Sequence, residues 1–393
     1  MKKVSIKLSV LALVLVSFCS IVNGQSSANT INVVTSAVPF LRISPDARSG
    51  GMGDVGVATT PDANSAFWNL AKYPFNTIPG GVSFTYTPWL KDLGLNDVYL
   101  ISGAGYYKLS DEEAISGSLR YFSLGNIQFT DNFGNELTSY RPREFSIDAG
   151  YSRKLSEKLS LGIALRFINS NLANGTINNV AYKAGTAVAA DLTLFHSNLK
   201  ADGSGLNYGI ALTNLGSKIS YTSDATQKDY IPANLGLGVA YTSAIDESNK
   251  ITFALDLHKL LVPTPPALFD SAGLIEYRSQ GVVGSWFKSF GDAPGGFSEE
   301  VKEVQASIGA EYWYNNQFAL RAGYFYENPI KGNRKYWTMG AGLKYNNFGL
   351  NFSYLLPSGS GVNRNPLSNT LRFSLFFDFD GSGGATATPD TKN

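Results

Sequence analysis

The segment from Leu371 to Phe379 constrains the fold of this chain more than any other. Apolar side chains hold every second position there, with Phe376 as the one exception on the polar side: Leu371, Phe373, Leu375, Phe377 and Phe379. Alternate side chains of a β-strand point to opposite faces, so one face of this strand is apolar and aromatic. Such a strand crosses a bilayer only within a closed barrel, because lipid cannot satisfy an open edge. This aromatic-ended strand near the C-terminus predicts an outer-membrane β-barrel.

The same alternation recurs from about residue 80 onward, in roughly fourteen segments, and bacterial barrels have even strand numbers. The connections alternate between short ones, such as 315–317 and 346–347, and long ones, such as 125–143 and 260–302. Short periplasmic turns and longer external loops are typical of outer-membrane barrels. We therefore predict an all-β fold, a transmembrane antiparallel barrel of about 14 strands. A soluble β-sandwich is the alternative, although it would not produce two loop lengths.

The N-terminus has the features of a secretory signal peptide. Lys2, Lys3 and Lys7 precede an apolar stretch over 8–18, and a small-residue cleavage site ends at Gly24. A membrane anchor and a lipoprotein attached at Cys19 are the alternatives. We expect four parts, namely a signal peptide (1–24), an N-terminal plug or hatch (25–78), the barrel (79–380) and a flexible tail (381–393).

Composition and motifs argue against several kinds of site. The single cysteine lies in the signal peptide, so the mature chain has no disulfide and no cysteine-ligated metal. His196 and His258 lack the spacing of metal-binding histidines. The GxSxG motif of a nucleophilic serine is absent. A net charge of +1 does not favour binding of nucleic acid. Gly51–Gly56 matches GxGxxG, but it follows Ser-Pro-Asp rather than a strand. We expect no enzyme, cofactor or metal.

The strand positions opposite the apolar rows carry balanced charges. Four acids face four bases there: Asp148, Asp191, Asp256 and Glu311 against Arg120, Arg166, Arg321 and Lys344. An ion-selective pore would favour one sign of charge. This balance predicts a lumen filled by pairs across the barrel and by the N-terminal plug. The candidate plug residues are Asp46, Arg48, Gly51, Gly53, Gly56, Asp62, Asn64, Trp68 and Asn69.

The block 40–58, with its continuation through 62–71, resembles the PorV/PorQ family of the type IX secretion system of Bacteroidota, a branch of the FadL-like fourteen-stranded transporters. The segments 218–221 and 230–236 are similar to the same family. FadL-type proteins commonly carry Asn-Pro-Ala in the hatch, whereas this chain has Asn69-Leu70-Ala71. The resemblance implies a non-enzymatic protein of the Gram-negative outer membrane that binds cargo through its C-terminal signal domain. Its implied partners are the translocon barrel, the cargo, a sortase-like attachment complex and outer-membrane lipid.

The long loop 260–302 is rich in apolar residues, which in an external loop should cover something. Its glycines predict that it adapts to different cargos. Our candidate contacts for cargo or translocon, with Trp286 and Phe287 as the expected anchors, are Leu268, Phe269, Tyr277, Trp286, Phe287 and Phe290. Folding back over the barrel's own mouth is the alternative for this loop. For the whole chain the alternatives are a FadL-like channel for hydrophobic small molecules, with an apolar pocket beneath the loops and a lateral gap in the wall, and a purely structural barrel.

Overall fold

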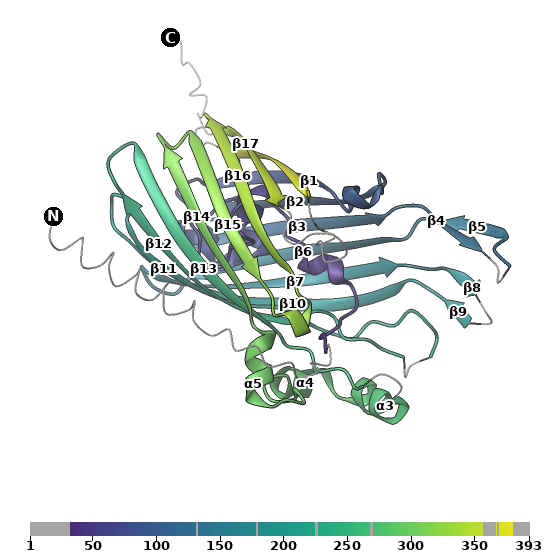
Figure 1. The fold of residues 1–393 in the computed structure, drawn as a ribbon. Helices are drawn as coiled ribbons and strands as arrows, with labels where there is room; N and C mark the ends of the chain where they lie inside the picture. The colour runs from purple at the N-terminus through teal and green to yellow at the C-terminus, as the bar shows by residue number, and fades with distance from the viewer. Residues whose placement is uncertain are drawn as a thin grey trace, which may run out of the picture. The chain divides into compact units, whose positions relative to one another are not determined.

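Fourteen strands form a closed antiparallel barrel in the computed structural model (Figure 1). The structure describes residues 32–130, 133–177, 180–224, 227–267, 270–356, 367 and 369–379. The barrel strands are β1 (Gly80–Pro88), β2 (Val98–Lys108), β3 (Glu113–Leu124), β6 (Arg143–Lys154), β7 (Leu159–Asn171), β10 (Gly185–Leu199), β11 (Gly205–Gly216), β12 (Asn234–Ala244), β13 (Asn249–Leu260), β14 (Gln305–Tyr314), β15 (Phe318–Tyr326), β16 (Lys335–Tyr345), β17 (Phe348–Leu356) and β18 (Leu371–Phe379). The predicted fold is confirmed. The expected signal peptide and C-terminal tail lie outside the described residues.

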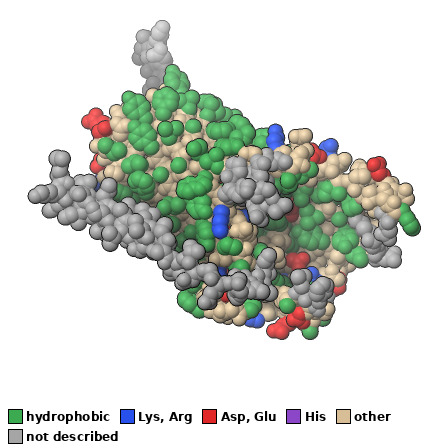
Figure 2. All heavy atoms as spheres, viewed as in Figure 1, with side chains coloured by type: hydrophobic (Ala, Val, Ile, Leu, Met, Phe, Trp, Pro, Cys, Tyr) green, Lys and Arg blue, Asp and Glu red, His purple; other side chains and the backbone are tan. Residues whose placement is uncertain are grey.

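The alternating pattern of β18 sorts its side chains as expected. Phe373, Leu375 and Phe377 are exposed on the outer wall, while Arg372 and Ser374 are buried inside. The strand closes the barrel by pairing with β1, from Gly80 opposite Phe379 to Tyr86 opposite Phe373. Hydrophobic side chains cover much of the visible barrel wall in Figure 2. The wall therefore presents to its surroundings the apolar surface that lipid requires.

The barrel has a turn end and a loop end. At the turn end, short connections join the strands, as at 155–158 and 346–347, and both Gly80 and Phe379 lie there. The loop end carries two hairpins, β4 (Ile127–Thr130) with β5 (Glu136–Tyr140) and β8 (Gly175–Ile177) with β9 (Val180–Tyr182), and the short helix η4 (Lys91–Leu93). This division matches the predicted rhythm of loop lengths.

The segment between β13 and β14, which the sequence analysis describes as a long loop, contains short helices, while its predicted adaptation to different cargos stays a prediction. It folds into α3 (Ser271–Ser279), α4 (Val282–Lys288), α5 (Phe297–Glu300) and η5 (Val301–Glu303), at the loop end in Figure 1. Asp270 caps α3 by accepting a hydrogen bond from Gly273 N, and Gly281 and Gly296 occupy the N-cap positions of α4 and α5. These glycines therefore begin helices. No helix among the described residues is long and apolar enough to cross a membrane.

Residues 32–79, which we call the hatch, run through the barrel. The hatch contains η1 (Pro39–Arg42), α2 (Ala47–Gly50), η2 (Ala63–Phe67) and η3 (Leu70–Phe75), drawn in purple inside the barrel in Figure 1. It starts at the loop end, where Asn32 N donates to Ile330 O of η6 (Pro329–Lys331) at 3.1 Å. It finishes at the turn end, where Asn76 Nδ2 donates to Tyr106 Oη at 2.7 Å. The hatch thus crosses the full height of the barrel before β1 begins.

Candidate functional site

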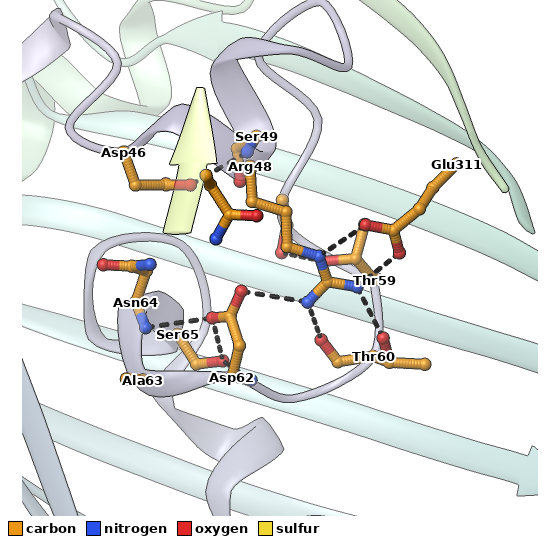
Figure 3. Close-up of polar contacts among 12 residues, drawn as sticks. Asp46, Arg48, Ser49, Thr59, Thr60, Asp62, Ala63, Asn64, Ser65 and Glu311 are labelled. Atoms are coloured by element: carbon orange, nitrogen blue, oxygen red, sulfur yellow. Dashed lines mark hydrogen bonds and ion pairs between the residues drawn. The ribbon is translucent and has the colours of Figure 1, made fainter. Parts of the chain in front are cut away.

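Arg48 is the centre of the polar contacts between the hatch and the wall (Figure 3). Its Nε and Nη2 donate to the Glu311 carboxylate of β14 at 2.9 and 2.7 Å. Its Nη1 donates to Asp62 Oδ2 at 2.9 Å, and its Nη2 to Thr60 Oγ1 at 2.6 Å. Burial alone would lower the pKa of Arg48, but the Glu311 and Asp62 carboxylates raise it well above its usual value. Arg48 therefore stays charged and fixes the hatch to the wall.

Further ion pairs lie along the inner wall, as the balanced inward charges predicted. Glu311 also accepts a hydrogen bond from Arg321 Nε at 2.7 Å. Arg166 bridges Asp148 and Asp191, and its Nη2 lies 2.9 Å from Asp191 Oδ2. The remaining inward groups contact the hatch or each other, since Asp256 accepts from Gly56 N, Arg120 donates to Leu41 O, and Lys344 pairs with Asp378. These pairs and the hatch share the lumen of the barrel.

The other candidate plug residues are also part of the hatch. Asp46 accepts hydrogen bonds from Ser49 N at 2.8 Å and Trp68 Nε1 at 2.7 Å. Asn69 Nδ2 donates to Val57 O and to Leu194 O of β10, which links the hatch to the wall. Asp62 accepts from Asn64 N at 2.9 Å.

The candidate glycines lie at close approaches of the backbone. A Cβ on Gly56 would come 2.3 Å from the Trp68 ring, and one on Gly51 would come 3.0 Å from Gly340 Cα. Gly53 has a φ of 72° and lies against the backbone of Tyr324. Gly51 and Gly53 thus let the hatch backbone approach the wall, and Gly56 leaves room for the Trp68 ring.

Two cavities lie on either side of the hatch. The loop-side cavity, of ≈ 110 Å³, mixes apolar residues with three arginines, Arg42, Arg120 and Arg334. Burial, followed by the neighbouring Arg334, lowers the pKa of Arg42 to about 9. The turn-side cavity, of ≈ 490 Å³, is lined by charged residues such as Lys250 and Asp378 and by Phe376, the exception in β18. With three arginines in its lining, the loop-side cavity is more polar than the predominantly apolar pocket expected for uptake of hydrophobic molecules.

The described candidate contacts divide by exposure. Phe287 of α4 is 75% exposed and Phe290 is 50% exposed. Trp286 is half-buried, and Tyr277 packs its ring 5.1 Å from that of Tyr230. Leu268 and Phe269 lie outside the described residues. Exposed apolar side chains of this segment that were not among the candidates are Leu274, Ile275, Val283, Phe297 and Val301. Their apolar type was visible in the sequence, but their exposure depends on how the helices pack.

An ion network that the sequence did not reveal holds α5 and η5 on the rim of the barrel. Lys259 Nζ of β13 lies 3.0 Å from Glu300 Oε2 and 2.6 Å from Glu303 Oε2. Lys331 of η6 lies 2.5 Å from Glu299 Oε1 and 3.0 Å from Glu303 Oε1. Burial alone would lower the pKa of Lys331, but its hydrogen bonds with Glu299 and Glu303 raise it. The described part of the chain brings together no group of His, Cys, Asp and Glu that could hold a metal ion.

Comparison with protein families fits this hatched barrel. The sequence model of the family described as "Type IX secretion system protein PorV" matches residues 25–267. The chain belongs to the PorV family. The resemblance seen in the sequence is confirmed, and the PorV family indicates an outer-membrane component of type IX secretion. A comparison with curated proteins gave no match.

Several solved structures are similar to this PorV-family barrel at low sequence identity. The Ralstonia pickettii toluene transporter TbuX is 13% identical, with coverage of 86% of this chain and 99% of that chain and a TM-score of 0.51. The P. putida toluene transporter TodX is 11% identical, with coverages of 86% and 99% and a TM-score of 0.48. A Pseudomonas aeruginosa FadL homologue is 11% identical, with coverages of 88% and 99% and a TM-score of 0.46. At such identities the likeness to TbuX shows the fold alone.

Proposed function

We propose that this PorV-family barrel is a non-enzymatic factor that binds cargo leaving the type IX translocon and delivers it to the attachment machinery at the cell surface. Cargo would be recognised through its C-terminal signal domain. The partners would be the translocon barrel, the cargo and a sortase-like attachment complex.

The exposed apolar face of the loop-end helices carries this proposal. Long loops of outer-membrane barrels face the outside of the cell, which is where cargo emerges. Phe287 and Ile275 are more than 70% exposed there, at 75% and 71%. Exposed aromatic and aliphatic groups gathered on one rim are typical of protein-binding surfaces. With the hatch in the lumen, we place partner binding on this rim.

Uptake of hydrophobic small molecules is the second candidate function, because TbuX is described as a toluene transporter. Such uptake needs an apolar pocket beneath the loops and an exit through the wall. The loop-side cavity is instead lined by Arg42, Arg120 and Arg334. Every neighbouring pair of the described barrel strands is hydrogen-bonded, with one register shift between Ala190 and Leu192. These features favour the secretion factor.

The test is co-purification of cargo and translocon with a Trp286→Ala/Phe287→Ala variant. Each anchor contributes about 2 kcal/mol in a typical hot spot. A combined loss of about 4 kcal/mol would weaken binding on the order of a thousandfold. The matched control is Leu155→Ala, which removes an exposed apolar side chain at the opposite end of the barrel. Undiminished recovery of both partners, at normal abundance of the variant in the outer membrane, would contradict the proposed surface.

Deleting the gene separates the two candidate functions. A secretion factor predicts that cargo with C-terminal signal domains stays in the cell while other outer-membrane proteins keep their levels. An uptake channel predicts normal cargo secretion together with loss of growth on a hydrophobic nutrient. The second result would favour uptake.

A further inference from the structure

Outward-facing aromatic side chains follow the loop-end half of the barrel wall over much of its circumference. Neighbouring rings lie close, as in Tyr324–Trp337 at 4.6 Å and Tyr86–Tyr99 at 5.8 Å. From β15 through the β1–β18 seam to β7, this row consists of Tyr324, Trp337, Phe352, Phe373, Tyr86, Tyr99, Tyr121, Phe145 and Phe167. Outer-membrane barrels carry such girdles where the wall meets the lipid headgroups. We call this row the loop-end belt.

The loop-end belt is interrupted from β10 to β14. On β10, Val188 lies opposite Phe167 of β7. On β14, Ala306 lies opposite Tyr326 of β15. Between them, the outward positions in the loop-end halves of β11, β12 and β13 hold Leu212, Leu235 and Leu257. The turn-end halves of these strands do carry outward aromatics, for example Tyr208, Tyr241 and Phe253. The interruption is therefore confined to one end of five complete, fully described strands.

The helical segment 297–303 lies at the rim of the barrel within this interruption, where ion pairs hold it to Lys259 of β13 and Lys331 of η6. Leu255, Leu257 and Lys259 share the outward parity of β13, and the first two are exposed. Lys259 is buried instead, because Glu300 and Glu303 cover its Nζ at 3.0 and 2.6 Å. The ring of Phe290 also lies near it, 5.8 Å from Lys259 Nζ. Segment 297–303 thus sits directly beyond the lipid-facing row of β13.

Two apolar side chains of this segment point away from its acidic face. Phe297 is 82% exposed and Val301 is 54% exposed. Phe297 is the first residue of α5 and Val301 the first residue of η5, while Glu300 and Glu303 of the same two elements turn towards Lys259. Leu257 lies two residues from Lys259, which places the exposed lipid-facing surface about 7 Å away along the strand. The exposed pair therefore continues an apolar surface that faces lipid.

We propose that Phe297 and Val301 insert into the interfacial region of the outer leaflet and complete the loop-end belt over β13 and β14. The occupant of this face is lipid, at the boundary between headgroups and acyl chains, where aromatic and aliphatic side chains bind favourably. The ion network of Lys259 holds the segment at that depth. The loop-end helices then form a platform anchored in the membrane, with Phe287 left to face protein partners. This inference uses other residues than the proposed function and goes beyond it.

Spin labelling tests the position of Phe297 directly. The single cysteine of the chain, Cys19, is replaced by Ser, and Phe297→Cys and Val301→Cys variants carry a nitroxide label. Leu257→Cys on the wall is the lipid-facing control, and Phe133→Cys, at a side chain 90% exposed in the loop between β4 and β5, is the aqueous control. The protein is reconstituted in vesicles of phosphatidylethanolamine and phosphatidylglycerol. The measurement compares collisions with apolar oxygen and with a water-soluble nickel chelate.

For labels at 297 and 301, we expect the ratio of oxygen collisions to nickel-chelate collisions to be close to the ratio for the label at Leu257. Ratios equal to that of Phe133 would place the pair in water and overturn the proposal. Immobile labels shielded from both reagents, appearing only when translocon co-purifies, would identify a protein contact and also overturn it. Because labelling can disturb the helix, Phe297→Trp and Phe297→Ser provide a second measurement. In vesicles, we expect the 271–303 segment of Phe297→Trp to stay protected from protease. We expect Phe297→Ser to lose this protection. Equal protection in both variants would also contradict the proposal.

Discussion

Arg48 and Glu311 form a two-point ion pair between the hatch and β14, although 263 positions separate them in the sequence. The two partners are not equivalent. Glu311 neutralises two guanidinium groups, those of Arg48 and Arg321, with shortest distances of 2.7 Å to each. Arg48 has a second carboxylate in Asp62, at 2.9 Å. Arg321 also donates a hydrogen bond from Nη1 to the neutral Asn351 Oδ1, at 2.8 Å. The carboxylate is thus the member of the network whose loss leaves the most uncompensated charge.

Glu311→Gln is therefore expected to destabilise the protein more than Arg48→Gln does. Breaking a buried ion pair from one side typically costs about 3–5 kcal/mol, because a charge stays buried without a partner. After Arg48→Gln, Arg321 still neutralises Glu311, so we expect a smaller loss. The measurement is the free energy of unfolding from urea titrations in lipid vesicles. Equal losses of unfolding free energy in the two variants would show that Glu311 contributes no more to stability than Arg48 does.

Lys72 should make the stability of the hatch depend on pH. Its Nζ donates to Gly56 O at 2.8 Å and to Thr59 Oγ1 at 3.3 Å, and burial lowers its pKa from 10.5 to about 8. Between these two values the unfolded chain binds the proton and the folded chain does not. The free energy of unfolding should therefore rise as the pH increases from about 8 to 10.5.

Lys72→Met should flatten this rise, whereas Lys158→Met, at an exposed turn, should leave it unchanged. The quantity to compare is the slope of unfolding free energy against pH in the three proteins. If wild-type protein and Lys72→Met have the same slope, other groups cause the dependence and this assignment is wrong.

The strands could be predicted from the sequence because each one carries its own alternating pattern. The Leu371–Phe379 strand alone identified both faces of the wall, and Arg372 lies inside as expected. Contacts such as Arg48–Glu311 could not be predicted, since a pairing across 263 positions depends on how the whole barrel closes. The helices α3 to α5 were missed for a related reason. Their segments are too short to be stable as isolated helices, and at least α5 and η5 depend on ion pairs with Lys259 and Lys331.

Gly323 should tolerate no side chain, because the hatch backbone touches the wall there. A Cβ on Gly323 would lie 2.0 Å from the Met52 carbonyl carbon. Gly323→Ala must therefore displace the hatch, and overpacking of this kind typically costs about 1–3 kcal/mol. Gly284→Ala on α4, where a Cβ meets nothing within 4 Å, is the matched control. Protease sensitivity of the hatch should increase only in Gly323→Ala. Identical digestion of both variants would argue against close packing of hatch and wall.

Phe379→Asp should abolish assembly, whereas Phe376→Asp should not. Phe379 is the exposed last residue of the outward row, and Phe376 faces the turn-side cavity at the same end of the barrel. A charge on the lipid face near the interface costs only about 0–1 kcal/mol, too little to unfold a barrel. Failure of Phe379→Asp alone would therefore reflect recognition of the aromatic end by the assembly machinery. The readout is the amount of each variant in purified outer membranes, and normal levels of Phe379→Asp would refute the prediction.

The course of the hatch through the barrel also has a consequence for the order of folding. The seam brings together β1 and β18, where Thr85 and Ser374 share a 2.6 Å hydrogen bond across 289 positions. Bringing such distant segments of the chain together has a cost in loop-closure entropy. Ser374 also accepts a hydrogen bond from Ala47 N of α2 at 2.9 Å, so the hatch offers the last strand a binding site before the ring is complete. We expect Ser374→Ala to slow closure of the seam. The rate of closure is measured with a pair of fluorescent labels on β1 and β18. The rate at which β2 pairs with β3 should not change. During biogenesis, the hatch would therefore bind β18 and position it for pairing with β1.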